Sequence, residues 1–262
     1  MKTVVLQSFR TRDVPPWMER CMASVRDWAR RQGHDYEFVG DAIFAFCGDD
    51  YLAQVGDDKR AITNLARLEL VRARLGADHE RAIWLDADVF VFAPERLAID
   101  IETGYAFGRH VWVWLDAAGR PVTRSGVHNA ALVFTRGQPD LDFLIAAIRH
   151  IAGTRKIAES YQVGVRLLSG LQYSLAFPLL GGVGVFSPAV LRALAEENDA
   201  VLAALAVAQD AEIQAANLCW SLRGEVEIEH LTLAMNRLEQ TAGGIVNRHL
   251  PKVAAQGVSP GR

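Results

Sequence analysis

The chain has few cysteines, no long apolar run and no excess of basic residues. Its 262 residues include three cysteines, Cys21, Cys47 and Cys219, which lie far apart and form no CxxC or Cys/His cluster with zinc spacing. This usage argues against a disulfide framework and a structural zinc site, and it favours a reducing compartment. With 28 basic and 31 acidic residues, the net charge of -3 does not favour a nucleic-acid partner.

Apolar runs are short along the whole sequence. The longest, 201–208, is far too short to span a membrane, and the run after Met1 is too short for a secretory signal. We therefore expect a soluble, cytoplasmic protein without a transmembrane segment, and the Ala- and Arg-rich composition weakly favours a bacterial source. Half of the residues are hydrophobic, which is enough for one substantial core.

Two acidic residues, Asp86 and Asp88, lie between two apolar runs, 82–85 and 89–92, that are typical of buried strands. In an extended chain, residues two apart point to the same side, with Cα atoms about 6.6 Å apart. Adjacent anions are costly unless they are neutralised, and Mg²⁺ or Mn²⁺ does so well because both prefer carboxylate oxygens. The pattern indicates a metal site at a sheet edge, where open α/β sheets bind ligands. The alternative is a surface turn with two solvated carboxylates.

The hydrophobic pattern predicts an α/β protein, with strands and helices in alternation. The expected strands cover 3–6, 36–39, 82–85, 89–92, 105–108, 111–115, 121–123, 127–135 and 226–228. The expected helices cover 16–31, 59–75, 139–151, 161–171, a segment that begins at 188, and 210–222. Loops are expected over 40–56 and 177–185. We expect a single domain over 1–253, with a mixed, mostly parallel sheet flanked by helices, and a loose tail over 254–262.

Polar residues at the ends of these elements are candidates for ligand contacts. Gln7 and Ser8 follow the first strand, where α/β proteins bind ligands, although an ordinary strand exit explains them equally well. Arg67 lies on a helix edge that faces either solvent or an anionic ligand, whose oxygens its planar guanidinium would fit. Asn129 begins a later strand, in which small residues such as Ala130 would let a ligand approach the backbone.

Several motifs, taken in order, resemble those of glycosyltransferases with the GT-A fold. The similarity is to small retaining sugar transferases of the glycogenin, galactosyltransferase and mannosyltransferase kind. The matching segments are 84–90 (DxD), 128–134 (N-a-G-v), 212–217 (the DQdxLN helix), 231–236 (LPxxxN) and 249–252 (Hxxg…K). The chain departs from the family pattern at Ala131, Glu212 and Ile213, where Gly, Asp and Gln are usual.

The resemblance implies a role for each matching residue. It implies a metal ion held by Asp86, Asp88 and His249, and the imidazole favours Mn²⁺ over Mg²⁺; His230 is a rival ligand. The implied contacts of a nucleotide-sugar donor are Gln7, Ser8, Arg67, Ala87, Asn129, Ala130 and Lys252. Glu212 or Gln214 is expected at the reacting carbon. The implied activity is metal-dependent transfer of a hexose, with retention, from a UDP- or GDP-sugar to a glycan or other hydroxyl acceptor.

Two other interpretations remain open. Phosphatases of the haloacid-dehalogenase type also begin with an apolar strand followed by DxD, so that Asp86 would be their nucleophile and Thr135 would end their second motif. That nucleophile normally lies near the N-terminus, whereas 85 residues precede Asp86. The third interpretation is a relative that binds sugar nucleotides without turnover, because the segment at Glu212 is altered.

Overall fold

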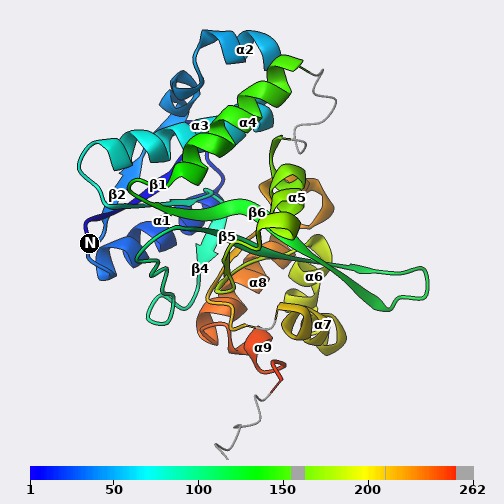
Figure 1. Cartoon of the computed structure of the whole chain (residues 1–262). Coiled ribbons are helices and arrows are strands. Elements are labelled where there is room, and N and C mark those ends of the chain that lie inside the picture. The colour runs from blue at the N-terminus through cyan, green and yellow to red at the C-terminus, as the bar shows by residue number, and fades with distance from the viewer. Residues whose placement is uncertain (155–162, 210, 252–262) are drawn as a thin grey trace, which may run out of the picture.

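A mixed sheet with helices on both faces forms the centre of the molecule (Figure 1). The structure is a computed structural model that describes residues 1–154, 163–209 and 211–251. Within them the sheet has six strands in the order β2-β1-β3-β6-β5-β7. Their bounds are β1 Thr3–Gln7, β2 Asp35–Phe38, β3 Arg81–Leu85, β5 Tyr105–Leu115, β6 Pro121–Thr135 and β7 Leu179–Leu180. Strand β6 runs antiparallel to β3 and β5, whereas the other three pairings are parallel.

A second, smaller sheet lies against the first. Its described strands are β4 (Val89–Val91), β9 (Ala215–Asn217) and β8 (Val183–Val185), in the order β4-β9-β8. Strand β4 follows β3 after only three residues, so the chain leaves the large sheet and enters the small one at residues 86–88. The acidic pair therefore lies at the junction of the two sheets.

The helices cover these sheets. They are α1 (Pro16–Arg31), α2 (Asp49–Val55), α3 (Lys59–Gly76), α4 (Pro139–Thr154), α5 (Val165–Leu175), α6 (Pro188–Glu196), α7 (Asp199–Gln209), α8 (Ile228–Gln240) and α9 (Gly244–Asn247), with 3₁₀ helices η1 (Gly40–Cys47) and η3 (Trp220–Glu225). Local signals set several of their starts. Asp58 caps α3 by accepting hydrogen bonds from the first amides of the helix, and Pro16 opens α1. No described helix is long and apolar enough to cross a membrane.

Strand alternation divides the core into layers. Val4, Leu6 and Trp84 face the cluster built on α3 and α4, whereas Val5 and Ile83 face the cluster that includes α1. Successive side chains of a strand point to opposite faces, so a strand covered by helices on both faces must be apolar throughout. All five residues of β3 are buried, as this placement requires. The predicted α/β domain with a mixed sheet flanked by helices is confirmed.

Four sequence-based assignments are wrong. The predicted loop 40–56 forms η1 and α2, which are delimited by Gly40, Gly48 and Gly56 at positive φ. The predicted loop 177–185 contains β7 and β8, and the predicted strand 226–228 is the approach to α8. The predicted helix 210–222 contains the buried strand β9, because pairing with β4 and β8 overrides the helix propensity of its alanines.

The predicted hairpin around residues 111–123 is present and long. The outer halves of β5 and β6 project from the body of the molecule (Figure 1). The Asp116 side chain accepts hydrogen bonds from the amides of Ala118 and Arg120, and Gly119 takes a positive φ of 74°, so the turn is closed locally. Strand β6 thus runs from the tip of this arm to the central sheet, and its register against β5 shifts between Phe107 and Gly108.

Candidate functional site

The turn between β3 and β4 positions the two carboxylates. The amide of Asp86 donates to the carbonyl of Ala130 (2.8 Å), and the carbonyl of Asp86 accepts from the amide of Val89 (3.0 Å). Leu85 pairs with Ala131 immediately before the turn. The neighbouring strand β6 therefore fixes where β3 ends, and Asp86 lies at the carboxyl end of a central strand, where sheets of this kind bind ligands.

Asp86 is paired with a buried arginine. One carboxylate oxygen, Oδ1, accepts from Arg67 Nη1 (2.9 Å) and from the indole Nε1 of Trp84 (2.6 Å). The Asp86 side chain is 26% exposed, whereas that of Arg67 is 7% exposed. Among the described residues, no donor reaches the other oxygen, Oδ2. Asp86 therefore keeps one carboxylate oxygen available to a ligand.

Arg67 is held on three sides. Its Nε donates to the carbonyl of Thr63 (3.1 Å), its Nη1 also donates to the carbonyl of Asn129 (2.5 Å), and its guanidinium lies 5.3 Å from the centre of the Trp84 ring. Within the described part of the chain, Nη2 has no acceptor. A guanidinium fixed along one edge and open along the other is suited to an oxyanion.

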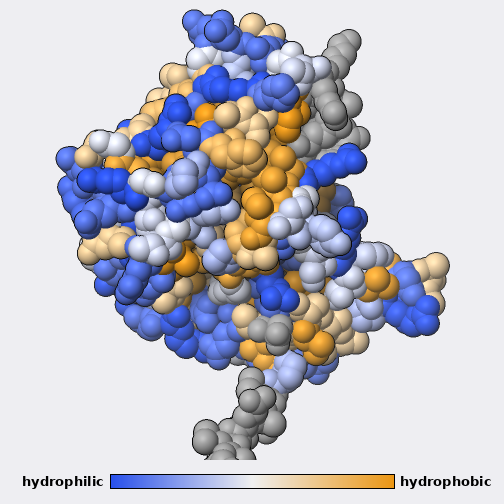
Figure 2. Space-filling model, in the orientation of Figure 1, coloured by the Kyte–Doolittle hydropathy of each residue, from blue (hydrophilic) through white to orange (hydrophobic). Residues whose placement is uncertain are grey.

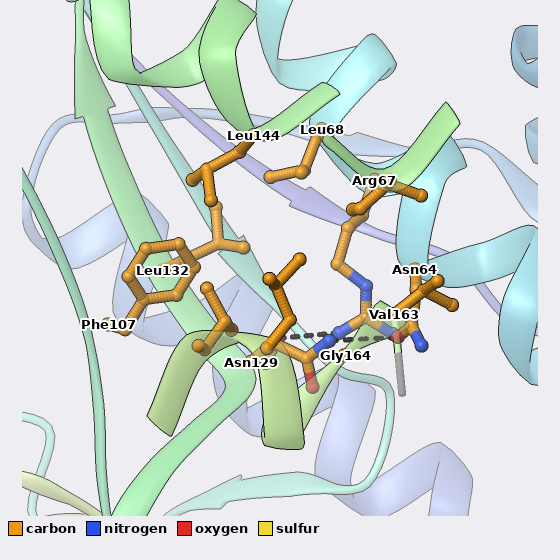
Figure 3. Close-up of a pocket in the computed structure, with 12 residues that line it drawn as sticks. Asn64, Arg67, Leu68, Phe107, Asn129, Leu132, Leu144, Val163 and Gly164 are labelled. Atoms are coloured by element: carbon orange, nitrogen blue, oxygen red, sulfur yellow. Dashed lines mark hydrogen bonds between the residues drawn. The ribbon is translucent and has the colours of Figure 1, made fainter. Parts of the chain in front are cut away.

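Arg67 is one of the residues that line a small pocket (Figure 3). Asn64 and Asn129 lie beside Arg67, and the amide of Asn129 donates to Asn64 Oδ1 (2.8 Å). The remaining wall is apolar and comes from α3, α4, α5 and the sheet, including Leu68, Leu132, Leu144 and Leu168. Apolar side chains also gather on the surface between α4 and α5 (Figure 2). The pocket thus combines a positive end, amide groups and an apolar wall.

Asp88 has different surroundings. Its Oδ1 accepts from the side-chain amide of Asn217 (2.5 Å), its Oδ2 accepts from the backbone amide of Trp220 (2.7 Å), and the residue is 8% exposed. Burial, followed by the nearby charge of Asp86, raises the pKa of Asp88. Both oxygens of Asp88 therefore join the turn to β9 and to the start of η3.

Gln7 and Ser8 contact protein groups. Gln7 is fully buried; its amide donates to the carbonyl of Asp86 (3.1 Å), and its Oε1 accepts from the hydroxyl of Tyr36 (3.0 Å). Ser8 Oγ donates to the carbonyl of Gly40 (2.8 Å). Both residues lie beside the site, and Gln7 holds its backbone in place; neither side chain is turned toward a ligand in this arrangement.

The other predicted donor contacts fall into three groups. Asn129 is one of the residues that line the pocket. Ala87 and Ala130 are buried, 5% and 6% exposed, so their backbones border the turn while their methyl groups pack into the core. Lys252 lies outside the described residues.

His249 does not join the carboxylate pair in this structure. Its Nε2 lies 3.3 Å from Asp199 Oδ1, at the start of α7, and accepts from Arg248 Nε (3.2 Å). Across the described ranges, no group of three or more His, Cys, Asp or Glu side chains could hold a metal ion. The predicted triad of Asp86, Asp88 and His249 is therefore corrected. The rival ligand His230 lies on α8, near the carboxylates of Glu196 and Glu227.

Glu212 and Gln214 are likewise separated from the pair. Glu212 forms an exposed ion pair with Arg96 (3.3 Å), and the carbonyl of Gln214 accepts from the amides of Phe92 and Ala93, beyond the far end of β4. Phe92 lies four positions after Asp88, just beyond β4, and this separation corresponds to roughly 13 Å of extended chain. The prediction that they lie at the reacting carbon is not supported, because the strand that follows them, β9, reaches the site with its far end, Asn217.

The same argument applies to Thr135 and the phosphatase interpretation. Strands β3 and β6 are antiparallel, so Thr135 pairs with Arg81 at the opposite end of β3 from Asp86. Its hydroxyl donates to the carbonyl of Gly104 (3.0 Å). The two motifs of a phosphatase would have to meet at one edge of the sheet, and here they lie at opposite edges.

Sequence reasoning missed three residues of this site. Trp84 and Asn217 each bind one of the carboxylates, but Trp84 looked like a strand residue and Asn217 was assigned to a helix. Arg10 lies 5.6 Å from the centre of the Phe9 ring and 5.7 Å from that of Trp220, whose backbone amide binds Asp88. Arg10 follows closely after the first predicted strand, and this position was the signal that could have marked it as a site residue.

His128, beside Asn129, connects the two sheets. It is 4% exposed; its Nε2 donates to the carbonyl of Val183 in β8 (3.2 Å), and its Nδ1 accepts from the amide of Ala130 (3.2 Å). Burial, then the neighbouring His110, lowers the pKa of His128 to about 3, so the ring is neutral. An added methyl group on Gly108 would overlap this ring, at 2.0 Å from Nε2. His128 therefore has a structural role.

Comparison with known proteins gives structural similarity only. No family model and no curated protein match the chain. A glycosyltransferase involved in glycosylation of the major capsid of PBCV-1 is 10% identical, with a TM-score of 0.49 over 90% of this chain and 100% of that one. Mouse xyloside xylosyltransferase 1 is 9% identical, with a TM-score of 0.45 over 84% and 99%. A Drosophila β-1,4-galactosyltransferase 7 mutant, in complex with manganese, UDP-Gal and xylobiose, is 12% identical, with a TM-score of 0.28 over 59% and 63%.

Proposed function

We propose that the protein is a glycosyltransferase that takes a sugar from a nucleotide-diphosphate sugar and passes it to a hydroxyl acceptor. The observation that carries the proposal is the group formed by Arg67, Asp86 and Asn129 at the carboxyl end of β3. Arg67 offers an open guanidinium edge to a phosphate, and Asp86 offers Oδ2 to a sugar hydroxyl. Amide groups beside them would hydrogen-bond further hydroxyls. This combination is complementary to a nucleotide sugar.

In this proposal the residues bind, orient and stabilise charge. Arg67 would offset the negative charge that develops on the leaving diphosphate, because a fixed donor costs no reorganisation at the moment of reaction. Asp86 and Asn129 would fix the donor relative to the pocket. Following the resemblance described above, we take the donor to be a UDP- or GDP-hexose, the acceptor to be a glycan or other hydroxyl compound, and the reaction to retain the anomeric configuration.

The family resemblance implies a divalent metal ion, and the oxygens of Asp86 and Asp88 show whether this site fits one. The structure shows Asp86 Oδ1 engaged with Arg67 and Trp84, and both oxygens of Asp88 engaged with protein amides. A divalent cation needs several oxygens that converge and are free to bind it. These residues do not fit such an ion, so no step is assigned to one.

The proposal is tested by a thermal-shift screen of nucleotide sugars, followed by an assay for nucleoside diphosphate release. We expect one donor to raise the Tm of the wild-type protein and to release its diphosphate, and Arg67→Met to remove both effects. Arg72→Met is the matched control, because Arg72 lies on the same helix but pairs with Glu69 and Asp142. No response to any donor, alone or with acceptors, would refute the proposal.

The same measurements separate the alternatives. A Tm increase without turnover, acceptors included, would identify a protein that binds donors without transferring sugar. Release of inorganic phosphate from simple phosphoesters, with a trapped phosphate on Asp86, would identify a phosphatase.

A further inference from the structure

We infer that the Asp86–Asp88 pair takes no divalent cation, and that the guanidinium of Arg67 supplies the fixed positive charge that faces the donor diphosphate. The part of this inference that concerns the diphosphate rests on the proposed function. The part that concerns the cation does not, because it follows from how each carboxylate is engaged.

Asp88 is committed to the chain segment that follows β9. The amide of Asn217 that binds Oδ1 is itself oriented, because Asn217 Oδ1 accepts from the amide of Cys219 (2.9 Å). The backbone amide of Trp220, which binds Oδ2, is the first of η3. Cys219 lies between them with a positive φ of 55°, a conformation that non-glycine residues rarely adopt. Asp88 thus holds a strained turn in place.

A cation at Asp88 would disturb this arrangement. The carboxylate would have to turn from Asn217, from the Trp220 amide, or from both, and either change leaves a buried donor without its acceptor. The carbonyl of Asp88 also accepts from the amide of Leu218 (2.9 Å), so the backbone cannot rotate to compensate without losing that bond as well. The ion would therefore bind at the expense of the η3 turn.

Asp86 already has a cation beside it. Arg67 is 7% exposed and 2.9 Å from Asp86, and its position is fixed by the carbonyls of Thr63 and Asn129. A metal ion on Asp86 would lie close to this buried guanidinium, and the repulsion between like charges would be weakly screened there. Arg67 occupies the electrostatic role that an ion would otherwise fill.

The Nη2 group of Arg67, which has no protein acceptor among the described residues, indicates how this side chain could bind an anionic ligand. In the described residues Nη2 has no protein acceptor, and Arg67 lines the pocket shown in Figure 3. Arg10 lies over the ring of Trp220, the residue whose backbone amide binds Asp88. The guanidinium of Arg67 therefore offers a fixed positive charge beside the turn, with which a diphosphate can pair in the absence of a metal ion.

The first experiment measures cation binding without any nucleotide. Wild-type protein is titrated with MnCl₂ while free Mn²⁺ is followed by electron paramagnetic resonance, and the Tm is measured with and without millimolar MnCl₂. We expect no saturable uptake and an unchanged Tm. Saturable binding that is lost in Asp86→Asn would overturn the inference.

The second experiment measures UDP and GDP binding by calorimetry, in EDTA and in MnCl₂. We expect the same affinity in both, a loss of at least about tenfold in Arg67→Met, and a smaller loss in Arg67→Lys, which keeps the charge but not the planar fork. Arg72→Met is again the control and should bind as the wild type does. If Arg67→Met does not fold, Arg67→Lys and the wild-type comparison decide the matter.

The outcomes separate this inference from the proposed function. Nucleotide binding that requires MnCl₂ would overturn the inference and leave the glycosyltransferase proposal standing. No nucleotide binding under either condition would overturn the role of Arg67 together with the proposed function. An affinity unchanged by EDTA but also unchanged in Arg67→Met would overturn the role of Arg67 alone.

Discussion

The two sheets that meet at residues 86–88 treat the two carboxylates of that turn differently. On the side of the large sheet, Asp86 is partly exposed, and one of its oxygens accepts from Arg67 and Trp84 while the other has no donor among the described residues. On the side of the small sheet, Asp88 is buried, and both of its oxygens are bound by amides of the β9–η3 segment. The same residue type, two positions apart, therefore keeps an open carboxylate oxygen in one case and has a structural role in the other.

This difference teaches that a DxD pattern does not define a metal site by itself. The carboxylates are close in sequence, but the partners that decide their roles come from residues 67, 84, 217 and 220. A metal site needs its oxygens to converge on one point. Here the two sheets direct them to separate partners.

The largest expected effect concerns the buried side of the turn. Asp88→Ala removes the acceptor of two buried donors, so we expect the free energy of unfolding to fall by about 2–4 kcal/mol. Urea unfolding measures this change. Asp86→Ala should cost less, because its side chain is partly exposed and Arg67 keeps two carbonyl acceptors. Equal losses in the two variants would contradict the comparison.

The next largest expected effect concerns His128, which connects the two sheets. The pKa of His128 is lowered to about 3 in the folded protein, so below its ordinary value of 6.5 the unfolded chain binds one more proton than the folded chain. This stability is fully present above pH 6.5 and is lost as the pH falls toward 3. Between pH 7 and pH 5 we expect a loss of about 2 kcal/mol from this residue.

Urea unfolding at several pH values tests this effect against His128→Gln, which keeps an amide near the carbonyl of Val183 but does not titrate. The slope of stability against pH should be smaller in the variant by the equivalent of one proton. The same slope in both proteins would show that His128 is not the group that titrates on unfolding.

The smallest expected effect lies on the large-sheet side. Tyr36→Phe leaves the buried Oε1 of Gln7 without its donor, and Gln7 supports the backbone of Asp86. We expect a loss of about 1 kcal/mol in the free energy of unfolding. Chemical denaturation of this variant beside Tyr173→Phe, in which the tyrosine is 92% exposed, provides the control. A loss as large in the control would remove the argument.

Several elements of the N-terminal half could be predicted from the sequence because they are regular, although the helices within 40–56 were not. The apolar runs of β1 and β3 and the capped, amphipathic α3 each carry a clear local signal. The segment around β9 could not be predicted, since three small residues become a strand only through pairing with β4 and β8. For the site, the sequence indicated Asp86, Arg67 and Asn129. It could not show that Asn217 would engage Asp88, because that contact spans 129 positions.

The position of Trp84 has a practical consequence. Its indole donates to Asp86 and lies against the guanidinium of Arg67. The chain has five other tryptophans. Indole fluorescence responds to nearby charge, so occupancy of the Arg67 edge can be followed as a change in emission without any added label. A Trp84→Phe variant lacks this indole, so comparison with the wild type shows how much of the emission change comes from Trp84.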